Sequence, residues 1–139
     1  MFTLNILTPE RRILTDAEIE EVIVPGDRGQ LDVLPGHAPL VSTLSAGVLR
    51  YRLKGATEQA SVAVSWGYME VHPTGVVVLA EMATKPEEVD RADAEAALKK
   101  AQNYLATMTP DPVEVEKYQR EVDELQAQLD LVEASHLSH

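Results

Sequence analysis

The sequence predicts an α+β protein with a β-rich N-terminal part, either a sandwich or a barrel, and a C-terminal hairpin of two helices. All seven glycines lie within the first 75 residues, among short apolar runs punctuated by Gly and Pro. That pattern is typical of sandwiches and barrels. The Gly-free remainder is rich in Ala, Glu, Lys and Leu, which favours helix. We therefore expect a β domain over residues 1–84 and a hairpin over residues 85–139.

Alternation with a period of two marks strands in the first part. Leu49, Tyr51 and Leu53 alternate with three basic residues, which predicts a strand with one buried face and one wet face. The continuous apolar runs over residues 22–24 and 76–79 predict strands that are covered on both faces. We expect roughly eight to ten short strands in all.

The second part carries helix signals. Pro86 suits the first turn of a helix, and acidic residues follow it near the positive end of the helix dipole. Residues 109–112 break the helical pattern, and Asp111 is a good N-cap for a second helix. Because the connection is short, we expect the helices to pack antiparallel. The expected seam consists of Ala97, Ala101 and Leu105 on the first helix and Val115, Tyr118, Val122, Leu125 and Leu129 on the second.

Composition and charge exclude several classes of function. The chain has no cysteine, so disulfides and thiolate chemistry are excluded. A formal net charge of −11 disfavours nucleic acid as a partner. No stretch approaches the roughly 18–20 apolar residues of a membrane span, and no charged-then-apolar leader precedes the first strand-like pattern. We expect a protein that stays in the cytoplasm.

Motifs that carry chemistry do not occur. The four histidines form neither an H-x-H pair nor H-E-x-x-H, so we expect no metal site, and His136 and His139 share a helical face only near the end of the chain. No nucleophile elbow, Walker A or dinucleotide fingerprint occurs. Residues 26–29 indicate a tight turn between strands rather than a phosphate loop. The protein is therefore expected to bind other proteins and not to catalyse a reaction.

An ordered series of motifs gives the chain a family resemblance. Its centre is the run LPGHAPL at residues 34–40, inside a dense block over residues 25–40. LTPER at residues 7–11, SAGVL at residues 45–49 and SWGYMEV at residues 65–71 flank that block in a family-like order and spacing. Together these motifs resemble the epsilon subunits of F-type ATP synthases over essentially the whole chain.

The resemblance implies a β-sandwich rather than a barrel, followed by the helical hairpin, in the central rotor of a proton-translocating ATP synthase. The family's sandwich binds the gamma subunit and rests on the membrane c-ring. Its hairpin can lie against the sandwich or extend along gamma toward the alpha and beta subunits, where it can impede ATP hydrolysis. The expected location is peripheral, on the cytoplasmic face of a bacterial inner membrane.

The resemblance also assigns residues to partners. Position by position, one loop matches the family's c-ring-facing site, and three residues match its gamma-facing side. His37 has a second interpretation as a turn residue satisfied by local backbone. The loop consists of Asp27, Arg28, Gly29, Gln30, Leu31 and Asp32, and the gamma-facing residues are Thr8, His37 and Ala38.

Several departures from the family pattern bear on regulation. Asp32 stands where glycine is common, and Ser65-Trp66 replaces a Gly-Gly step. Some bacterial members bind ATP through Ile/Leu-Asp-x-x-Arg-Ala, whereas Asp93 occupies the arginine position here and would repel a phosphate. Arg91 lies about 200° around the helix and cannot easily substitute. We therefore predict no ATP binding of physiological strength and no cofactor, with the degenerate motif at Val89, Asp90, Asp93 and Ala94.

The charge of the last segment bears on inhibition. Residues 111–139 contain eight acidic and two basic side chains, which leaves a net charge of −6. The resemblance implies that an extended hairpin meets an acidic segment of the beta subunits, and like charges across an interface are costly. We expect weak inhibition by this hairpin. Two other functional classes stay open from the residues alone: a ligand-binding sandwich, and a hydrolase whose scattered carboxylates converge in space.

Overall fold

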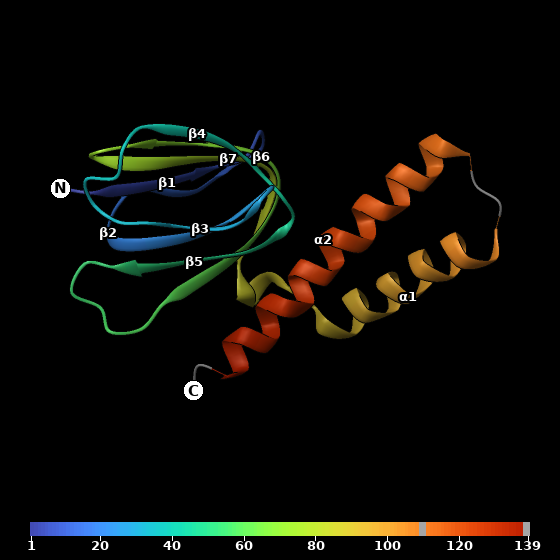
Figure 1. Cartoon of the computed structure of the whole chain (residues 1–139). Helices are drawn as coiled ribbons and strands as arrows, with labels where there is room; N and C mark the ends of the chain where they lie inside the picture. The colour runs from blue at the N-terminus through green and yellow to red at the C-terminus, as the bar shows by residue number, and fades with distance from the viewer. Residues whose placement is uncertain (109–110, 138–139) are drawn as a thin grey trace.

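The computed structural model describes residues 1–108 and 111–137 and shows a two-layered β domain beside a helical hairpin (Figure 1). Seven strands form the β domain, fewer than the eight to ten expected. The reason is that two of them, with 15 and 13 residues, run through stretches that look like separate short strands. The strands are β1 (Thr3–Leu7), β2 (Arg12–Gly26), β3 (Gly29–Val33), β4 (Leu40–Leu44), β5 (Gly47–Leu53), β6 (Ala60–His72) and β7 (Gly75–Thr84).

The strands form the expected β-sandwich. One layer contains the first half of β2, β1, β7, the second half of β6 and β4, and the other contains β3, the second half of β2, β5 and the first half of β6. The long strands β2 and β6 therefore belong to both layers. All strand pairs among the described residues are antiparallel except β1–β7, which is parallel.

Strand β6 changes the side that faces the core where it passes between the layers. Val62 and Val64 point inward in its first half, whereas Met69 and Val71 point inward in its second half. Gly67 lies between these two pairs, and a Cβ there would lie 1.9 Å from the backbone oxygen of Leu79. Only glycine allows β6 and β7 to approach so closely at this corner.

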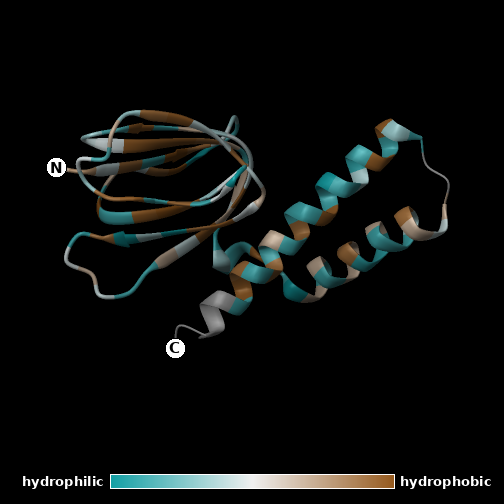
Figure 2. Ribbon diagram, in the orientation of Figure 1, coloured by the Kyte–Doolittle hydropathy of each residue, from teal (hydrophilic) through white to brown (hydrophobic). Residues whose placement is uncertain are grey.

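The core between the layers is apolar. The side chains of Leu4, Ile6, Val24, Leu49 and Val78 are fully buried in it. Hydrophobic burial of this kind supplies the main driving force for folding. Figure 2 shows the corresponding hydrophobic stretches along the strands.

A short connector joins the sandwich to the hairpin. It contains a 3-10 turn, η1 (Pro86–Glu88), and the first helix, α1 (Arg91–Thr107), begins only after it. The expectation that Pro86 opens the first helix is wrong, because Val89 and Asp90 are extended. Asp90 is the N-cap of α1, and its side chain accepts a hydrogen bond from the backbone N–H of Asp93.

The second helix, α2 (Pro112–Leu137), packs against both α1 and the sandwich. The Asp111 carboxylate accepts a hydrogen bond of 2.9 Å from the backbone N–H of Glu114, as expected for an N-cap. Tyr104 and Tyr118 stack at a centroid distance of 4.2 Å near the turn of the hairpin. Among the described residues, no helix is long and apolar enough to cross a membrane.

The hairpin has two apolar stripes rather than one. Of the expected seam, Ala101 is buried, Tyr118, Val122, Leu125 and Leu129 are half-buried, and Val115 is exposed. A second stripe on α2, Ala127 and Leu131, is buried against Ala63 of β6. This stripe places α2 between α1 and the sandwich.

Candidate subunit-binding surface

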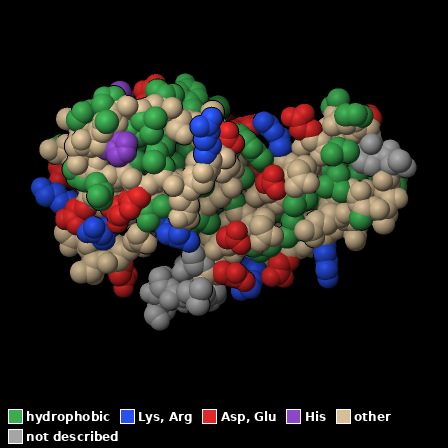
Figure 3. Space-filling model, viewed as in Figure 1, with side chains coloured by type: hydrophobic (Ala, Val, Ile, Leu, Met, Phe, Trp, Pro, Cys, Tyr) green, Lys and Arg blue, Asp and Glu red, His purple; other side chains and the backbone are tan. Residues whose placement is uncertain are grey.

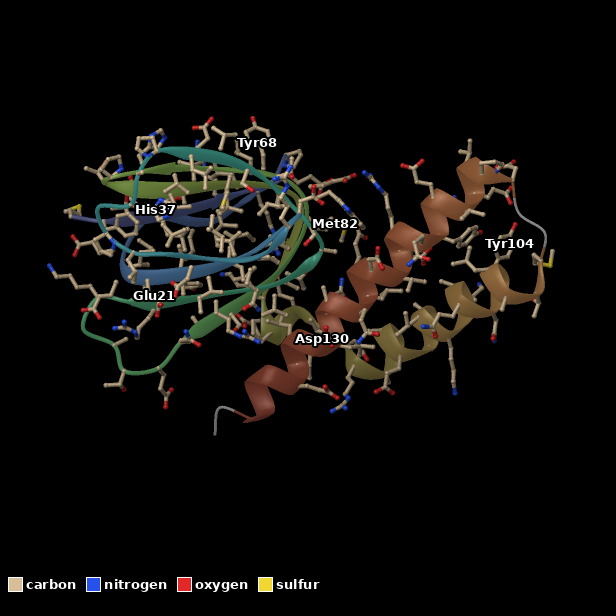
Figure 4. The ribbon with its side chains drawn as sticks, viewed as in Figure 1. Glu21, His37, Tyr68, Met82, Tyr104 and Asp130 are labelled. Carbon is tan, nitrogen blue, oxygen red and sulfur yellow. The ribbon has the colours of Figure 1, made fainter. Side chains whose placement is uncertain are left out.

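The outer face of the layer β1–β7–β6–β4 carries a group of exposed and half-buried apolar side chains, with the polar Asn5 and Glu70 among them. Strand register places Leu7, Leu79, Tyr68 and Thr43 side by side across the four strands. Val41, on β4, is 69% exposed, and Tyr68 is 45% exposed. Figure 3 shows hydrophobic side chains gathered over the upper part of the sandwich, and Figure 4 shows Tyr68 at the top of the sandwich in the same view. We refer to Leu7, Val41, Tyr68, Val77 and Leu79 as the outer apolar face.

The outer apolar face explains a feature of the sequence that the fold alone does not. The run over residues 76–79 predicts a strand covered on both sides, but only Val76 and Val78 are buried. Val77 and Leu79 point outward and are only half-buried. Strands buried on both faces carry continuous apolar runs, and contiguous exposed apolar patches mark interaction sites. The second cover is therefore expected to come from another molecule.

The predicted gamma-facing residues lie at the two ends of this face. Thr8 follows β1, and its Oγ1 accepts a hydrogen bond of 3.1 Å from the backbone N–H of Arg11. His37 and Ala38 precede β4 at the opposite end, where the backbone N–H of Gly36 donates to the oxygen of Pro73. The His37 Nδ1 lies 2.7 Å from the Ala38 oxygen, so its ring has the local backbone partner of the second interpretation. Partner contact by these residues stays a prediction.

The predicted c-ring-facing residues form the β2–β3 turn and the start of β3. Asp27 and Arg28 are exposed at the tip, and Gly29 has a φ of +114°, a conformation that favours glycine. Of the remaining residues, Gln30 and Asp32 are exposed and Leu31 is half-buried. Hydrogen bonding to the Asp32 carboxyl raises the pKa of Glu21 on the neighbouring strand. The turn is a compact, charged projection that is distinct from the outer apolar face.

The outer face of the other layer is charged. Arg52 on β5 forms ion pairs with Glu20 and Glu21 on β2, and Lys54 lies 3.9 Å from Glu18. Cross-strand pairs of opposite charge contribute modestly to sheet stability and are compatible with water. The two outer faces of the sandwich are thus chemically different. The charged face is compatible with water, whereas the apolar face is expected to be covered by a partner.

An ion pair fastens the connector to the sandwich. The Arg11 guanidinium donates to both Glu88 carboxylate oxygens, at 2.6 and 2.7 Å, and also to the Ala83 oxygen at 2.8 Å. The Arg11 hydrogen bonds, with the backbone N–H of Lys85, lower the pKa of Glu88 to about 2. Bidentate pairing of this kind is geometrically specific. The connector is therefore fixed up to Glu88.

Residues of the degenerate ATP-binding motif, at residues 89–94, pack within the protein itself. Val89 packs beside the cluster that contains Ala127 and Leu131, and Ala94 is buried. Arg91 pairs with Glu95 at 3.2 Å and lies 3.9 Å from Glu133. No group of three His, Asp or Glu residues that could hold a metal ion occurs within the part of the chain that the structure describes. The side chains of His136 and His139 lie outside that part.

The sequence of the β domain matches a known family. Residues 1–86 match the family model described as the ATP synthase delta/epsilon chain, β-sandwich domain. The chain belongs to the ATP synthase delta/epsilon family. The resemblance inferred from the motifs and the predicted fold class are both confirmed.

Curated relatives extend the match beyond the sandwich. The ATP synthase epsilon chain of Bdellovibrio bacteriovorus is 52% identical over 87 residues, which cover 63% of this chain and 62% of that protein. The epsilon chain of Koribacter versatilis is 43% identical over 110 residues, 79% of this chain and 75% of the relative. That of Trichlorobacter lovleyi is 38% identical over 116 residues, 84% and 82% of the two chains.

Solved structures of low sequence identity share the fold. A chain in the mitochondrial ATP synthase of Euglena gracilis, in an assembly of OSCP, F1 and the c-ring, has a TM-score of 0.79 at 20% identity and covers 97% of this chain and 81% of its own. A chain in the central stalk and c-ring of the Tetrahymena thermophila enzyme has a TM-score of 0.62 at 12% identity, with coverage of 94% and 96%.

Two groups of surface residues were missed by sequence reasoning. For Val41 and Tyr68 of the outer apolar face, the sequence offered one indirect indication of an apolar surface, the continuous apolar run on β7. Arg120 of α2, whose Cζ lies 4.7 Å from the centre of the Trp66 ring, carried none, because that contact depends on how the hairpin docks. Trp66 stood out in the sequence as part of the departure from a Gly-Gly step, and Arg120 of α2 lies over its ring.

Proposed function

We propose that the chain acts as the epsilon subunit in the central stalk of an F-type ATP synthase, with the gamma subunit bound on its outer apolar face. The observation that carries this proposal is that face itself, an apolar sheet surface that the chain leaves uncovered. Family membership supplies the setting, since the relatives are named ATP synthase epsilon chains.

A rotor role agrees with the physical character of the β domain. Two layers share the long strands β2 and β6, so the sandwich is tied together at its corners. A stiff domain with several distinct faces can transmit rotation between partners without catalytic groups of its own. In this proposal the subunit couples proton transport to ATP synthesis as a non-catalytic component.

The β2–β3 turn is proposed as the second contact, toward the c-ring. Its charged tip at Asp27 and Arg28 is exposed, so it suits contact with a polar loop of the partner rather than with an apolar groove. This places the subunit at the membrane surface through the complex, on the cytoplasmic side of a bacterial inner membrane. Neither of these two proposed contacts involves the hairpin, which is proposed to meet the alpha and beta subunits when it leaves the sandwich.

The gamma contact is tested with one charge placed on the outer apolar face. Val41→Asp introduces a carboxylate at a 69% exposed position, so the free chain should keep its fold. Buried without a partner in the complex, that charge should weaken binding to the purified gamma subunit by about 100-fold, the effect of losing a strong hot spot.

The matched control lies in the other layer. Leu53 is also exposed, at 43%, and Leu53→Asp adds the same charge away from the outer apolar face. Surface plasmon resonance should show gamma binding within about threefold of the unmodified chain for this variant, because surface substitutions away from a contact are nearly neutral. If the two variants bind the gamma subunit equally well, the gamma subunit does not bind on the outer apolar face.

A further inference from the structure

Among the residues whose side chains the structure describes, few apolar side chains are buried between the hairpin and the sandwich. This buried group consists of Ala63 on β6 with Ala127 and Leu131 on α2, and Val48 and Val89 lie at its edge. Figure 1 shows α1 on the far side of α2, away from the strands. Relative motion is the default for two units of one chain unless the interface between them is large and hydrophobic. Specific contacts are needed to hold one arrangement.

One side chain of α2 supplies such contacts to two strands at once. The Arg120 guanidinium lies over the Trp66 ring, 4.7 Å from its centre, and its Nη1 lies 3.6 Å from Glu81 Oε2. The pairs Ser65–Met82 and Gly67–Ala80 flank these two residues, so Trp66 and Glu81 stand side by side on β6 and β7. Arginine is suited to this site because it stacks on an aromatic face while it pairs with a carboxylate.

The other basic residue of α2 makes no such bridge. Lys117 lies 5.7 Å from the ring of Tyr118, within the hairpin. Arg91 of α1 also pairs inside the hairpin, with Glu95 and Glu133. Within the described residues, Arg120–Glu81 is the ion pair that joins the hairpin helices to the sandwich.

The connector contains a natural pivot. The Arg11–Glu88 ion pair fixes the chain up to Glu88, and α1 begins at Arg91. Between them, Val89 has φ −90° and ψ 123°, and Asp90 has φ −91° and ψ 107°. Two extended residues between two fixed ends can change their dihedral angles without loss of helix or strand, as hinge residues do.

We propose that Arg120, seated between Trp66 and Glu81, is the latch that holds the hairpin on the sandwich in this chain. That the hairpin can leave the sandwich is already implied by the family resemblance; what is new is the side chain that keeps it there. In this proposal the docked state is held by the protein's own side chains. This inference concerns the free chain, so its failure would leave the proposed gamma contact untouched.

Thiol labelling tests the latch, because the chain has no cysteine of its own. Ala127→Cys places a thiol in the interface between α2 and the sandwich, where Ala127 is 4% exposed. Ala101→Cys places one in the hairpin, where Ala101 is 3% exposed. Maleimide labels a buried thiol only when it opens, so the first thiol reports release and the second reports disruption of the hairpin.

The decisive comparison is Arg120→Gln against Lys117→Gln, which remove the same charge from the same helix. Arg120→Gln should raise the labelling rate at position 127 by about tenfold, the effect of losing a partly desolvated cation–π contact and an ion pair. Its rate at position 101 should not change. Trp66→Leu, which keeps an apolar side chain, should raise labelling at position 127 to a similar degree, and Lys117→Gln should change neither rate.

Other outcomes would overturn the latch. An unchanged rate at position 127 in Arg120→Gln would show that Arg120 does not hold the hairpin. Equal increases in the labelling rate at positions 127 and 101 would indicate unfolding of the hairpin rather than its release from the sandwich. Labelling of the Ala127→Cys chain as fast as in urea, with Arg120 in place, would mean that the docked arrangement does not persist.

Discussion

At the scale of single residues, Gly67 is required by the close approach of two strands rather than by a turn. A Cβ at this position would lie 1.9 Å from the Leu79 backbone oxygen, and the strands cannot separate without breaking pairs on both sides. Gly67→Ala should therefore lower the free energy of unfolding by about 3 kcal/mol, the cost of severe overpacking. Urea unfolding followed by circular dichroism measures this.

Gly55→Ala is the comparison for that measurement. Gly55 has a φ of +81°, but nothing lies within 4 Å of a Cβ added there. Its cost should be only about 1 kcal/mol, from backbone strain alone. If both substitutions cost the same, the close approach at the β6–β7 corner is not what selects glycine.

The Arg11–Glu88 ion pair makes a prediction about titration. The pKa of Glu88 is lowered to about 2 by Arg11 and by the backbone N–H of Lys85, so the folded state holds Glu88 ionised more strongly than the unfolded state does. Stability from this pair is present above the ordinary carboxyl pKa of about 4.5 and is lost as the pH falls toward 2. Arg11→Gln should raise the Glu88 pKa by more than one unit. Carbon-detected NMR titration of the Glu88 carboxyl measures it, and an unchanged value would contradict the pairing.

At the scale of elements, the helices and the strand pattern were predictable, but the shared strands were not. Alternation identified the buried side of β5 at Leu49 and Tyr51, whereas Leu53, at the end of that strand, is exposed. Alternation failed on β2 and β6, since a strand that crosses between layers changes the side it buries. The heptad seam of α2 likewise concealed the Ala127 and Leu131 stripe, because a helix between two partners carries two patterns at once.

The docking of α2 should depend on pH through Glu124. Burial, with the charge of nearby Glu81, raises the pKa of Glu124, although Arg120 opposes the shift; Ser65 and Glu121 are the other neighbours that bear on it. The ionised carboxylate therefore disfavours docking, and docking should strengthen as the pH falls through that raised pKa.

Glu124→Gln tests this dependence, because it removes the charge and keeps the shape. Near pH 7 the variant should dock more firmly than the unmodified chain, and the difference should shrink as the pH is lowered toward the ordinary carboxyl pKa. Thermal unfolding of the helical signal at several pH values measures the difference. A gap that grows on acidification would show that Glu124 is stabilised in its ionised form.

At the scale of the whole molecule, charge separates the roles of the two parts. The sandwich presents an apolar outer face, whereas residues 111–139 carry a net charge of −6. In the proposed role, the outer apolar face binds the gamma subunit stably. Residues 111–139 approach the acidic segment that the family resemblance implies for the beta subunits only at an electrostatic cost. Truncation of the assembled complex after Thr84 should therefore raise ATP hydrolysis by less than about twofold, since only weak inhibition is removed.

The truncation has a matched gain-of-function control. Glu116 and Glu121 are exposed on α2, so the double change Glu116→Lys and Glu121→Lys should leave the fold intact and reduce the repulsion. The assembled complex with this variant should hydrolyse ATP more slowly than the unmodified complex, and truncation should then release that inhibition. A tenfold rise on truncation of the unmodified chain would show that apolar contacts of the hairpin, such as exposed Val113 and Met108, outweigh its charge.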